Sequence, residues 1–152
     1  MKLIITLISI ITIIASCQSS DVKKKPLAKK AVALDTTTFT TIKWIDSLKD
    51  IGTVPAGETA EIKFKFQNTG EKPLIIVEAK PGCGCTLADY PKEPIAPGKQ
   101  GVITANYKVD KDGQGEFRKN VRVTTNTKGN TDTYIFFYGK IKSSADSASK
   151  KK

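Results

Sequence analysis

Two cysteines lie on either side of a single glycine in the segment Pro81-Gly82-Cys83-Gly84-Cys85-Thr86, in a chain that contains no histidine. A disulfide between Cys83 and Cys85 is sterically feasible, because residues two positions apart in a bent loop can bring their Cα atoms within about 4.4 to 6.8 Å. Gly84 adds the backbone freedom that such a loop needs. Closing so short a loop stabilises a fold by only about 1.6 kcal/mol in the chain-entropy treatment. A disulfide here is therefore expected to be reducible more than structural.

A metal site and a pair of inert thiols are the two other interpretations of Cys83 and Cys85. Two thiolates suit a soft ion such as copper(I), but a closed zinc site needs four ligands and usually separates paired cysteines by two to four residues. The chain offers no histidine and only one further cysteine, Cys17, so the sequence predicts no bound metal and no cofactor. Cysteines buried under a loop as small apolar side chains are the third interpretation. The disulfide is favoured over free thiols and over a metal site, but the sequence alone does not decide among them.

Conventional acid–base catalysis finds no support in the sequence. Without histidine there is no Ser-His-Asp or Cys-His arrangement, and no glycine-rich phosphate loop is present. Asp89 and Glu93 lie in the loop sequence LADYPKEP and are interpreted as turn and surface residues. The sequence therefore predicts no catalytic residues and a protein that is not an enzyme.

The first seventeen residues have the layout of an export signal, with Lys2, an apolar run over residues 3–14 and small residues before Cys17. That run is too short to cross a bilayer as a permanent helix. The ending Ile14-Ala15-Ser16-Cys17 resembles the bacterial lipobox, in which cleavage occurs before a lipid-modified cysteine. The resemblance implies that residues 1–16 are a lipoprotein signal peptide and that Cys17 is the lipidation site. An ordinary cleaved signal peptide is the alternative.

The formal net charge of +10 lies mostly outside the predicted domain. Residues 18–34 hold five lysines and one acid, and residues 142–152 hold four lysines and one acid. We interpret residues 17–34 as a lipidated cysteine with a flexible basic linker, and residues 142–152 as a disordered basic tail. A nucleic-acid-binding protein would concentrate its cations on a folded face among aromatic residues, so no nucleic-acid partner is predicted.

The segments that must position the cysteines alternate between apolar and polar side chains with a period of two. In residues 59–68, Ala60, Ile62, Phe64 and Phe66 alternate with polar residues, and residues 102–109 and 117–125 repeat the pattern. Residues 39–45, 73–79 and 133–141 are further strand candidates. The last two are apolar on both faces and are therefore predicted to be central in a sheet.

Short strands separated by turn residues, with no amphipathic helix, predict an all-β fold. We expect residues 35–141 to form an immunoglobulin-like β-sandwich of about seven strands, preceded by the signal peptide and flexible linker. A small closed barrel is the alternative. Trp44 lies on the first expected strand and is interpreted as a packing residue. Cys83 and Cys85 are too close in sequence to join two sheets as antibody domains do, so the core must hold by packing alone.

Several short motifs within residues 35–141 resemble one known family. They are Asp50-Ile51-Gly52, Gly57-Glu58, Asn68-Thr69-Gly70, Pro73-Leu74, Cys83-Gly84-Cys85-Thr86 and Pro94-Ile95-Ala96-Pro97-Gly98. Together they resemble domain of unknown function 1573 (DUF1573), a family of immunoglobulin-like domains in exported bacterial lipoproteins. The resemblance implies a loop position for the two cysteines, directly after a strand. A more distant similarity to Hydin-type and PapD-like sandwich domains implies an interaction scaffold.

These observations predict a cell-envelope lipoprotein with one immunoglobulin-like domain and no enzymatic activity. Its expected partners are the membrane, through the lipid anchor, and an envelope protein or glycan bound by its loops or an open strand edge. The lysines that follow Cys17 favour an anchor on the outer membrane facing the periplasm. The alternative function is thiol–disulfide redox chemistry or copper(I) handling through Cys83 and Cys85.

Overall fold

Eight strands and one short 3₁₀ helix make up residues 35–142, the part of the chain that the computed structural model describes. In chain order these elements are η1 (Thr36–Thr38), β1 (Ile42–Trp44), β2 (Leu48–Pro55), β3 (Thr59–Asn68), β4 (Ile76–Pro81), β5 (Thr86–Asp89), β6 (Gln100–Lys108), β7 (Gly115–Thr125) and β8 (Asp132–Lys142). Between residues 35 and 142, no helical segment has the length and apolar character needed to cross a bilayer.

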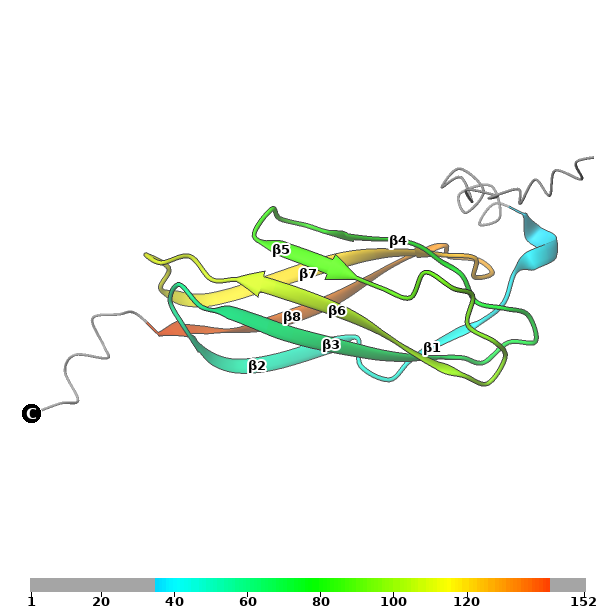
Figure 1. The fold of residues 1–152 in the computed structure, drawn as a ribbon, viewed down its shortest axis with the longest axis horizontal. Helices are drawn as coiled ribbons and strands as arrows, with labels where there is room; N and C mark the ends of the chain where they lie inside the picture. The colour runs from blue at the N-terminus through cyan, green and yellow to red at the C-terminus, as the bar shows by residue number, and fades with distance from the viewer. Residues whose placement is uncertain (1–34, 143–152) are drawn as a thin grey trace, which may run out of the picture.

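The strands form two four-stranded sheets that pack face to face (Figure 1). The β6 sheet has the order β1-β3-β6-β5 and the β8 sheet has the order β2-β8-β7-β4. All pairs are antiparallel except β2 with β8, which run parallel. Within residues 35–142 the chain changes sheet after each of the strands β1, β2, β3, β4 and β6. The β1–β2 and β4–β5 connections join edge strands, at opposite edges of the sandwich. This is the immunoglobulin-like sandwich that the sequence predicts.

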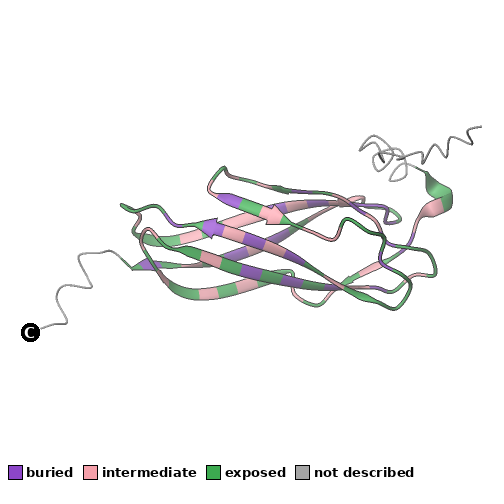
Figure 2. Cartoon of the chain, viewed as in Figure 1, coloured by how far each residue is buried: buried purple, intermediate pink, exposed green. Residues whose placement is uncertain are grey.

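The core consists of the inward-facing side chains of both sheets, which alternate with outward-facing polar side chains (Figure 2). The period-two pattern of residues 59–68, 102–109 and 117–125 is confirmed by β3, β6 and β7. Aromatic rings fill the centre: the Phe64 and Phe137 centroids lie 6.5 Å apart across the two sheets. Trp44 packs as predicted, with its ring centroid 5.5 Å from that of Phe66.

The strand count is eight, against the seven or so expected, because the sequence did not reveal β2 and β5. β2 bulges between Asp50 and Thr53, so its alternation is interrupted at Ile51 and Gly52. Gly52 has a φ of 68° there, a conformation that favours glycine. β5 is only four residues long, which is too short for a period-two pattern to stand out.

The position predicted for one strand is wrong: of the two strands expected to be central, β8 is central but β4 lies at an edge of the β8 sheet. Residues 73–79 are apolar on both faces for another reason. Leu74 is buried before β4 begins, where its backbone pairs with that of Ile95, and a bulge between Ile76 and Glu78 shifts the alternation. At the other boundary, β8 includes Lys142, which the sequence assigned to the tail.

Two fully buried asparagines tie together the loops at the end of the sandwich where β4 begins. We call Asn68, Asn126 and the groups that they bind the asparagine cluster. Asn68 Oδ1 accepts from Thr40 Oγ1 (3.0 Å) and Gly70 N (3.1 Å), and its Nδ2 donates to the carbonyls of Lys72 (2.8 Å) and Ile95 (2.9 Å). Asn126 Oδ1 accepts from Ile75 N (2.7 Å), and its Nδ2 donates to the carbonyls of Thr38 (2.8 Å) and Pro73 (3.0 Å). Three of the six family-like motifs meet here: Asn68-Thr69-Gly70, Pro73-Leu74 and Pro94-Ile95-Ala96-Pro97-Gly98.

Candidate functional sites

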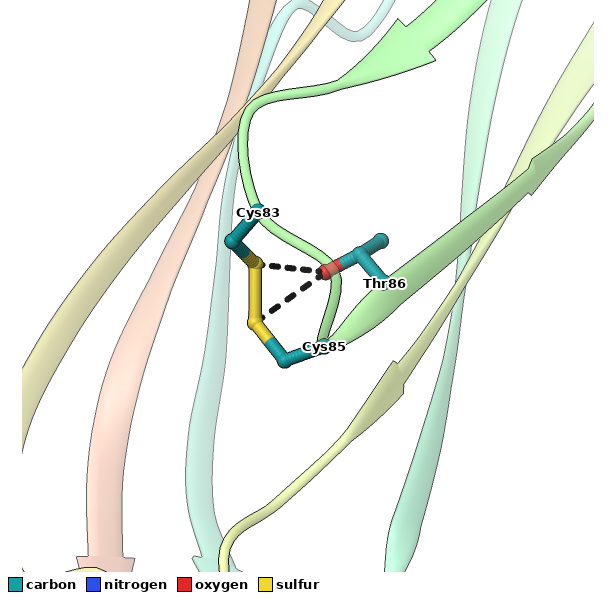
Figure 3. The surroundings of a disulfide bond; sticks show 3 residues. All are labelled: Cys83, Cys85 and Thr86. Atoms are coloured by element: carbon teal, nitrogen blue, oxygen red, sulfur yellow. Dashed lines mark hydrogen bonds between the residues drawn. A yellow bond between two sulfur atoms is a disulfide. The ribbon is translucent and has the colours of Figure 1, made fainter.

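The two cysteines lie where the chain leaves the β8 sheet at the end of β4 and enters the β6 sheet at β5. Their sulfur atoms are bonded at 2.05 Å, and their Cα atoms are 5.3 Å apart (Figure 3). Both residues are half-buried, whereas Gly82 and Gly84 are exposed. We call residues 82–86 the disulfide corner. A loop directly after a strand is the position that the family resemblance implies for this motif.

Three backbone hydrogen bonds fix the disulfide corner, and none of them involves a sulfur atom. They run from Gly82 N to Asn120 O (3.0 Å), from Lys108 N to Cys85 O (2.8 Å) and from Thr86 N to Cys83 O (3.4 Å). A Cβ at position 82 would come within 2.7 Å of Asn120 Oδ1, so a larger residue there would require the Asn120 side chain to shift. The two ends of the loop are thus held to β7 and β6 by backbone hydrogen bonds as well as by the disulfide.

Thr86 is the polar side chain that contacts the disulfide. It is 3 % exposed, and its Oγ1 lies 3.5 Å from Cys83 Sγ and 3.9 Å from Cys85 Sγ. Beneath it, Thr86 pairs with Tyr107 of β6. Burial, with a smaller contribution from Asp110, raises the pKa of the Tyr107 phenol above its ordinary value. The side chain next to Thr86 in the β6 sheet is therefore a buried, neutral phenol.

The bonded sulfurs offer no thiolate to a soft metal ion in this form of the protein. Among residues 35–142, no group of three or more acidic, cysteine or histidine side chains is placed to hold a metal ion. Cys17, the predicted lipidation site, lies outside the described residues, as do the signal peptide and the linker.

A second site, which the sequence did not indicate, is an open hollow of about 770 Å³ on the outer face of the β8 sheet. Side chains of β2, β8 and β7 line it. Its most exposed apolar members are Leu48 and Tyr138, which are 55 % and 38 % exposed. The hollow lies beside the bulge of β2, which is held by a hydrogen bond from Gly52 N to Asp50 Oδ1 (2.8 Å).

Tyr138 occupies the middle of this hollow, between a carboxylate and a guanidinium. Strand register places Asp50 of β2 on one side of it and Arg118 of β7 on the other. Glu116 and Lys140, which pair with each other one step along the strands, complete the charged rim. Within the described part of the chain, none of these four charged side chains forms an ion pair.

An aromatic row continues from Tyr138 along the outer face of β8. Phe136 and Tyr134 are the next two outward residues, and their ring centroids lie 6.5 Å apart in a stacked arrangement. The Arg118 guanidinium lies 4.7 Å from the centroid of the Phe136 ring, close enough for a cation–π interaction. The sequence contained this signal in residues 133–141, but apolar residues on both faces were interpreted only as evidence for a central strand.

The strand edges are poorly suited to bind a further strand. β1 and β5 have three and four residues. β2 and β4 are bulged, and β4 ends in Pro81. Short strands, bulges and proline all disfavour strand addition at a sheet edge. Of the surfaces that the structure describes, the outer face of the β8 sheet is therefore the better candidate for binding.

Comparisons with known proteins identify the fold but no activity. A family profile with the description "Protein of unknown function (DUF1573)" matches residues 42–141. No curated protein matches the chain in sequence.

Solved structures that match parts of the chain come from diverse proteins. A protein of unknown function from Porphyromonas gingivalis W83 matches with a TM-score of 0.61 and 16 % identity, over 71 % of this chain and 50 % of that one. The secreted serine protease VesC from Vibrio cholerae gives a TM-score of 0.49 and 12 % identity, over 70 % and 24 % of the two chains. A PapD-like domain of human CEP192 gives 0.48 and 12 %, over 91 % and 97 %. The chain thus spans half the length of the P. gingivalis protein, and at these identities the likeness concerns the fold alone.

Proposed function

We propose that this chain, which belongs to the DUF1573 family, is a membrane-tethered binding domain of the bacterial cell envelope that binds an oligosaccharide in the hollow around Tyr138. The observation that carries the proposal is the set of four charged side chains, two of each sign, that surround an exposed aromatic ring without pairing among themselves. Such groups are available to a ligand.

A neutral polyhydroxylated ligand matches this set of groups best. Carboxylates such as Asp50 and Glu116 only accept hydrogen bonds, whereas Arg118 and Lys140 only donate them. A sugar hydroxyl does both, so one ligand satisfies both kinds of side chain. The apolar face of a sugar ring can pack on the ring of Tyr138. The four charges sum to zero, so the hollow gives a polyanion no net electrostatic attraction.

The size and shape of the hollow agree with a small ligand or a short stretch of a polymer. Pockets for small molecules typically measure about 300 to 1,000 Å³, and this one, at about 770 Å³, lies in that range. Beyond Tyr138, the aromatic row continues on the same face of β8 with Phe136 and Tyr134, so a chain of sugar residues could extend from the hollow over these rings. No catalytic role is proposed for the site.

The tether belongs to the proposal because of the lipobox-like ending Ile14-Ala15-Ser16-Cys17. Several acyl chains on one cysteine would anchor the protein stably, since each buried methylene contributes about 0.8 kcal/mol. We place the anchor on the outer membrane, facing the periplasm. Intact-mass analysis of protein extracted from membranes tests this: the chain should begin at Cys17 and carry acyl chains, and a soluble, unacylated form would contradict the tether.

Isothermal titration of the full chain with gluco-, manno- and amino-sugar oligosaccharides tests the binding site. Tyr138→Ala should weaken binding of the preferred oligosaccharide at least about tenfold, because it removes the stacking surface. Tyr138→Phe keeps the ring and should bind within about threefold of the unchanged protein.

Leu87→Ala is the matched control, since Leu87 is an exposed apolar residue on the other sheet. It should leave binding unchanged. Failure of every oligosaccharide to bind, or binding that Tyr138→Ala does not weaken, would overturn the proposal. Binding of a polypeptide at Tyr138 in place of a sugar would do the same for the ligand class.

A further inference from the structure

We propose that the disulfide corner is a thiol–disulfide exchange site that accepts two electrons from the dithiol of another exported protein while the domain stays folded. This site is separate from the hollow and does not depend on sugar binding. Three features of the corner support it: the small contribution of the disulfide to stability, the backbone hydrogen bonds that hold both ends of the loop, and the position of Thr86.

The disulfide contributes little to the fold. It joins residues two positions apart, and closing so short a loop is worth only about 1.6 kcal/mol in the chain-entropy treatment. Sixteen buried hydrophobic side chains already form a continuous core across both sheets. A bond that the fold does not need for its stability is free to be broken and re-formed.

Breaking the bond would leave both ends of the loop in place. The hydrogen bonds from Gly82 N to Asn120 O and from Lys108 N to Cys85 O hold both ends of the loop to β7 and β6. Gly84 at the tip is exposed, and a Cβ built there would have no atom within 4 Å. A partner thiolate can therefore approach over the glycine side of the bond without displacing other parts of the domain.

Thr86 is placed to assist the leaving sulfur. Its buried hydroxyl lies within 3.5 Å of Cys83 Sγ and 3.9 Å of Cys85 Sγ, so it can donate to whichever sulfur becomes a thiolate. A hydrogen bond to a charged acceptor is worth about 1.5 to 3 kcal/mol.

The exchange proceeds in two balanced steps. A partner thiolate attacks Cys83 Sγ, since Cys85 is the cysteine that packs against the core. The Cys83–Cys85 bond breaks, a mixed disulfide forms between Cys83 and the partner, and Cys85 leaves as a thiolate. The second thiol of the partner, as its thiolate, then attacks the partner sulfur of the mixed disulfide and releases Cys83. Overall, two electrons and two protons pass from the partner dithiol, which becomes a disulfide, to the Cys83–Cys85 pair.

Reduction of the folded full chain by dithiothreitol, and then by reduced thioredoxin, tests the proposal. Alkylation and peptide mapping read Cys83 and Cys85 separately from Cys17. Thr86→Val removes the hydroxyl and keeps the shape of the side chain, so reduction should slow about tenfold. Thr86→Ser restores a hydroxyl and should recover the rate to within about threefold. A circular dichroism spectrum that is unchanged during reduction is expected.

Two results would overturn the exchange site. One is reduction that occurs only when the domain unfolds, seen as a rate that follows the unfolding rate across urea concentrations. The other is a Thr86→Val variant that is reduced as fast as the unchanged protein. The attacked sulfur has its own test with oxidised glutathione as the trap: Cys83 in Cys85→Ser should form the mixed disulfide and release reduced glutathione faster than Cys85 in Cys83→Ser, and the reverse order would refute the assignment to Cys83.

Discussion

The asparagine cluster and the disulfide corner lie at opposite ends of β4, and they hold the chain in different ways. At the start of the strand, Asn126 makes three hydrogen bonds to the backbone of segments far apart in sequence. At the end of the strand, a covalent bond joins Cys83 to a residue two positions away. The non-covalent site connects the distant segments, and the covalent one connects neighbours.

This difference separates structural residues from functional candidates. Long-range ties between loops are needed for the fold, because each loop carries backbone groups that must be paired when buried. A disulfide between neighbours restrains little of the unfolded chain. We therefore assign the motifs around Asn68 and Asn126 to stability, and the motif around Cys83 and Cys85 to chemistry.

The largest expected loss of stability comes from a variant that removes hydrogen bonds of the asparagine cluster. Asn126→Ala removes three hydrogen bonds made by a fully buried side chain, to Ile75 N–H and to the carbonyls of Thr38 and Pro73. Each lost hydrogen bond costs about 0.5 to 1.5 kcal/mol and the missing amide leaves a cavity, so the free energy of unfolding should fall by about 3 kcal/mol. Urea denaturation followed by tryptophan fluorescence, through Trp44, measures it.

Asn106→Ala is the control for this loss. Asn106 lies on the outer face of β6 and makes no side-chain hydrogen bond within residues 35–142. Its replacement should change the free energy of unfolding by no more than about 0.5 kcal/mol. Equal losses at Asn106 and Asn126 would contradict the structural role of the asparagine cluster.

A smaller loss of stability is expected when the disulfide is removed. The double variant Cys83→Ser/Cys85→Ser should lose less than about 2 kcal/mol of unfolding free energy, because the loop that the bond closes is so short. The same urea experiment measures it, with and without a reductant for the unchanged protein. A loss as large as that of Asn126→Ala would make the disulfide a structural bond and remove the contrast between the two ends of β4.

The smallest expected effect is a pH dependence of stability, which tests whether the phenol of Tyr107, the strand partner of Thr86, is buried. Burial raises the folded-state pKa of Tyr107 above its ordinary value of 10.0. A raised pKa gives stability that is fully present below the unfolded pKa and is lost as pH rises through the folded pKa. Tyr107→Phe has no proton to lose, so its urea midpoint should fall less between about pH 8 and about pH 11 than that of the unchanged protein. Parallel pH profiles for both proteins would argue against a buried phenol.

Much of the fold could be predicted from the sequence because its long strands alternate strictly. In β3, Ile62, Phe64 and Phe66 are buried as their spacing predicts, since successive residues of a strand point to opposite faces. β2 escaped prediction because a bulge interrupts its pattern, and a bulge depends on pairing with a strand more than 80 residues later. Local spacing cannot reveal such a pairing.

The candidate sites were predictable only in part. The position of Cys83 and Cys85 in a loop after a strand follows from the family resemblance, but the contacts with Thr86 and Asn120 arise from tertiary structure. The hollow depends on three strands that are distant in sequence and on the register that sets Asp50, Tyr138 and Arg118 side by side. No single segment contains that information.

The parallel pairing of β2 with β8 has a mechanical consequence. A pull between the amino end of β2 and the carboxyl end of β8 acts along the two strands in opposite directions, because Leu48 is opposite Phe136 and Pro55 is opposite Lys142. The load is therefore a shear force shared by all the hydrogen bonds between the two strands. These bonds must rupture together, because the geometry does not let them open one after another. A domain tethered at one end and gripped at the other would resist extension through this pair of strands.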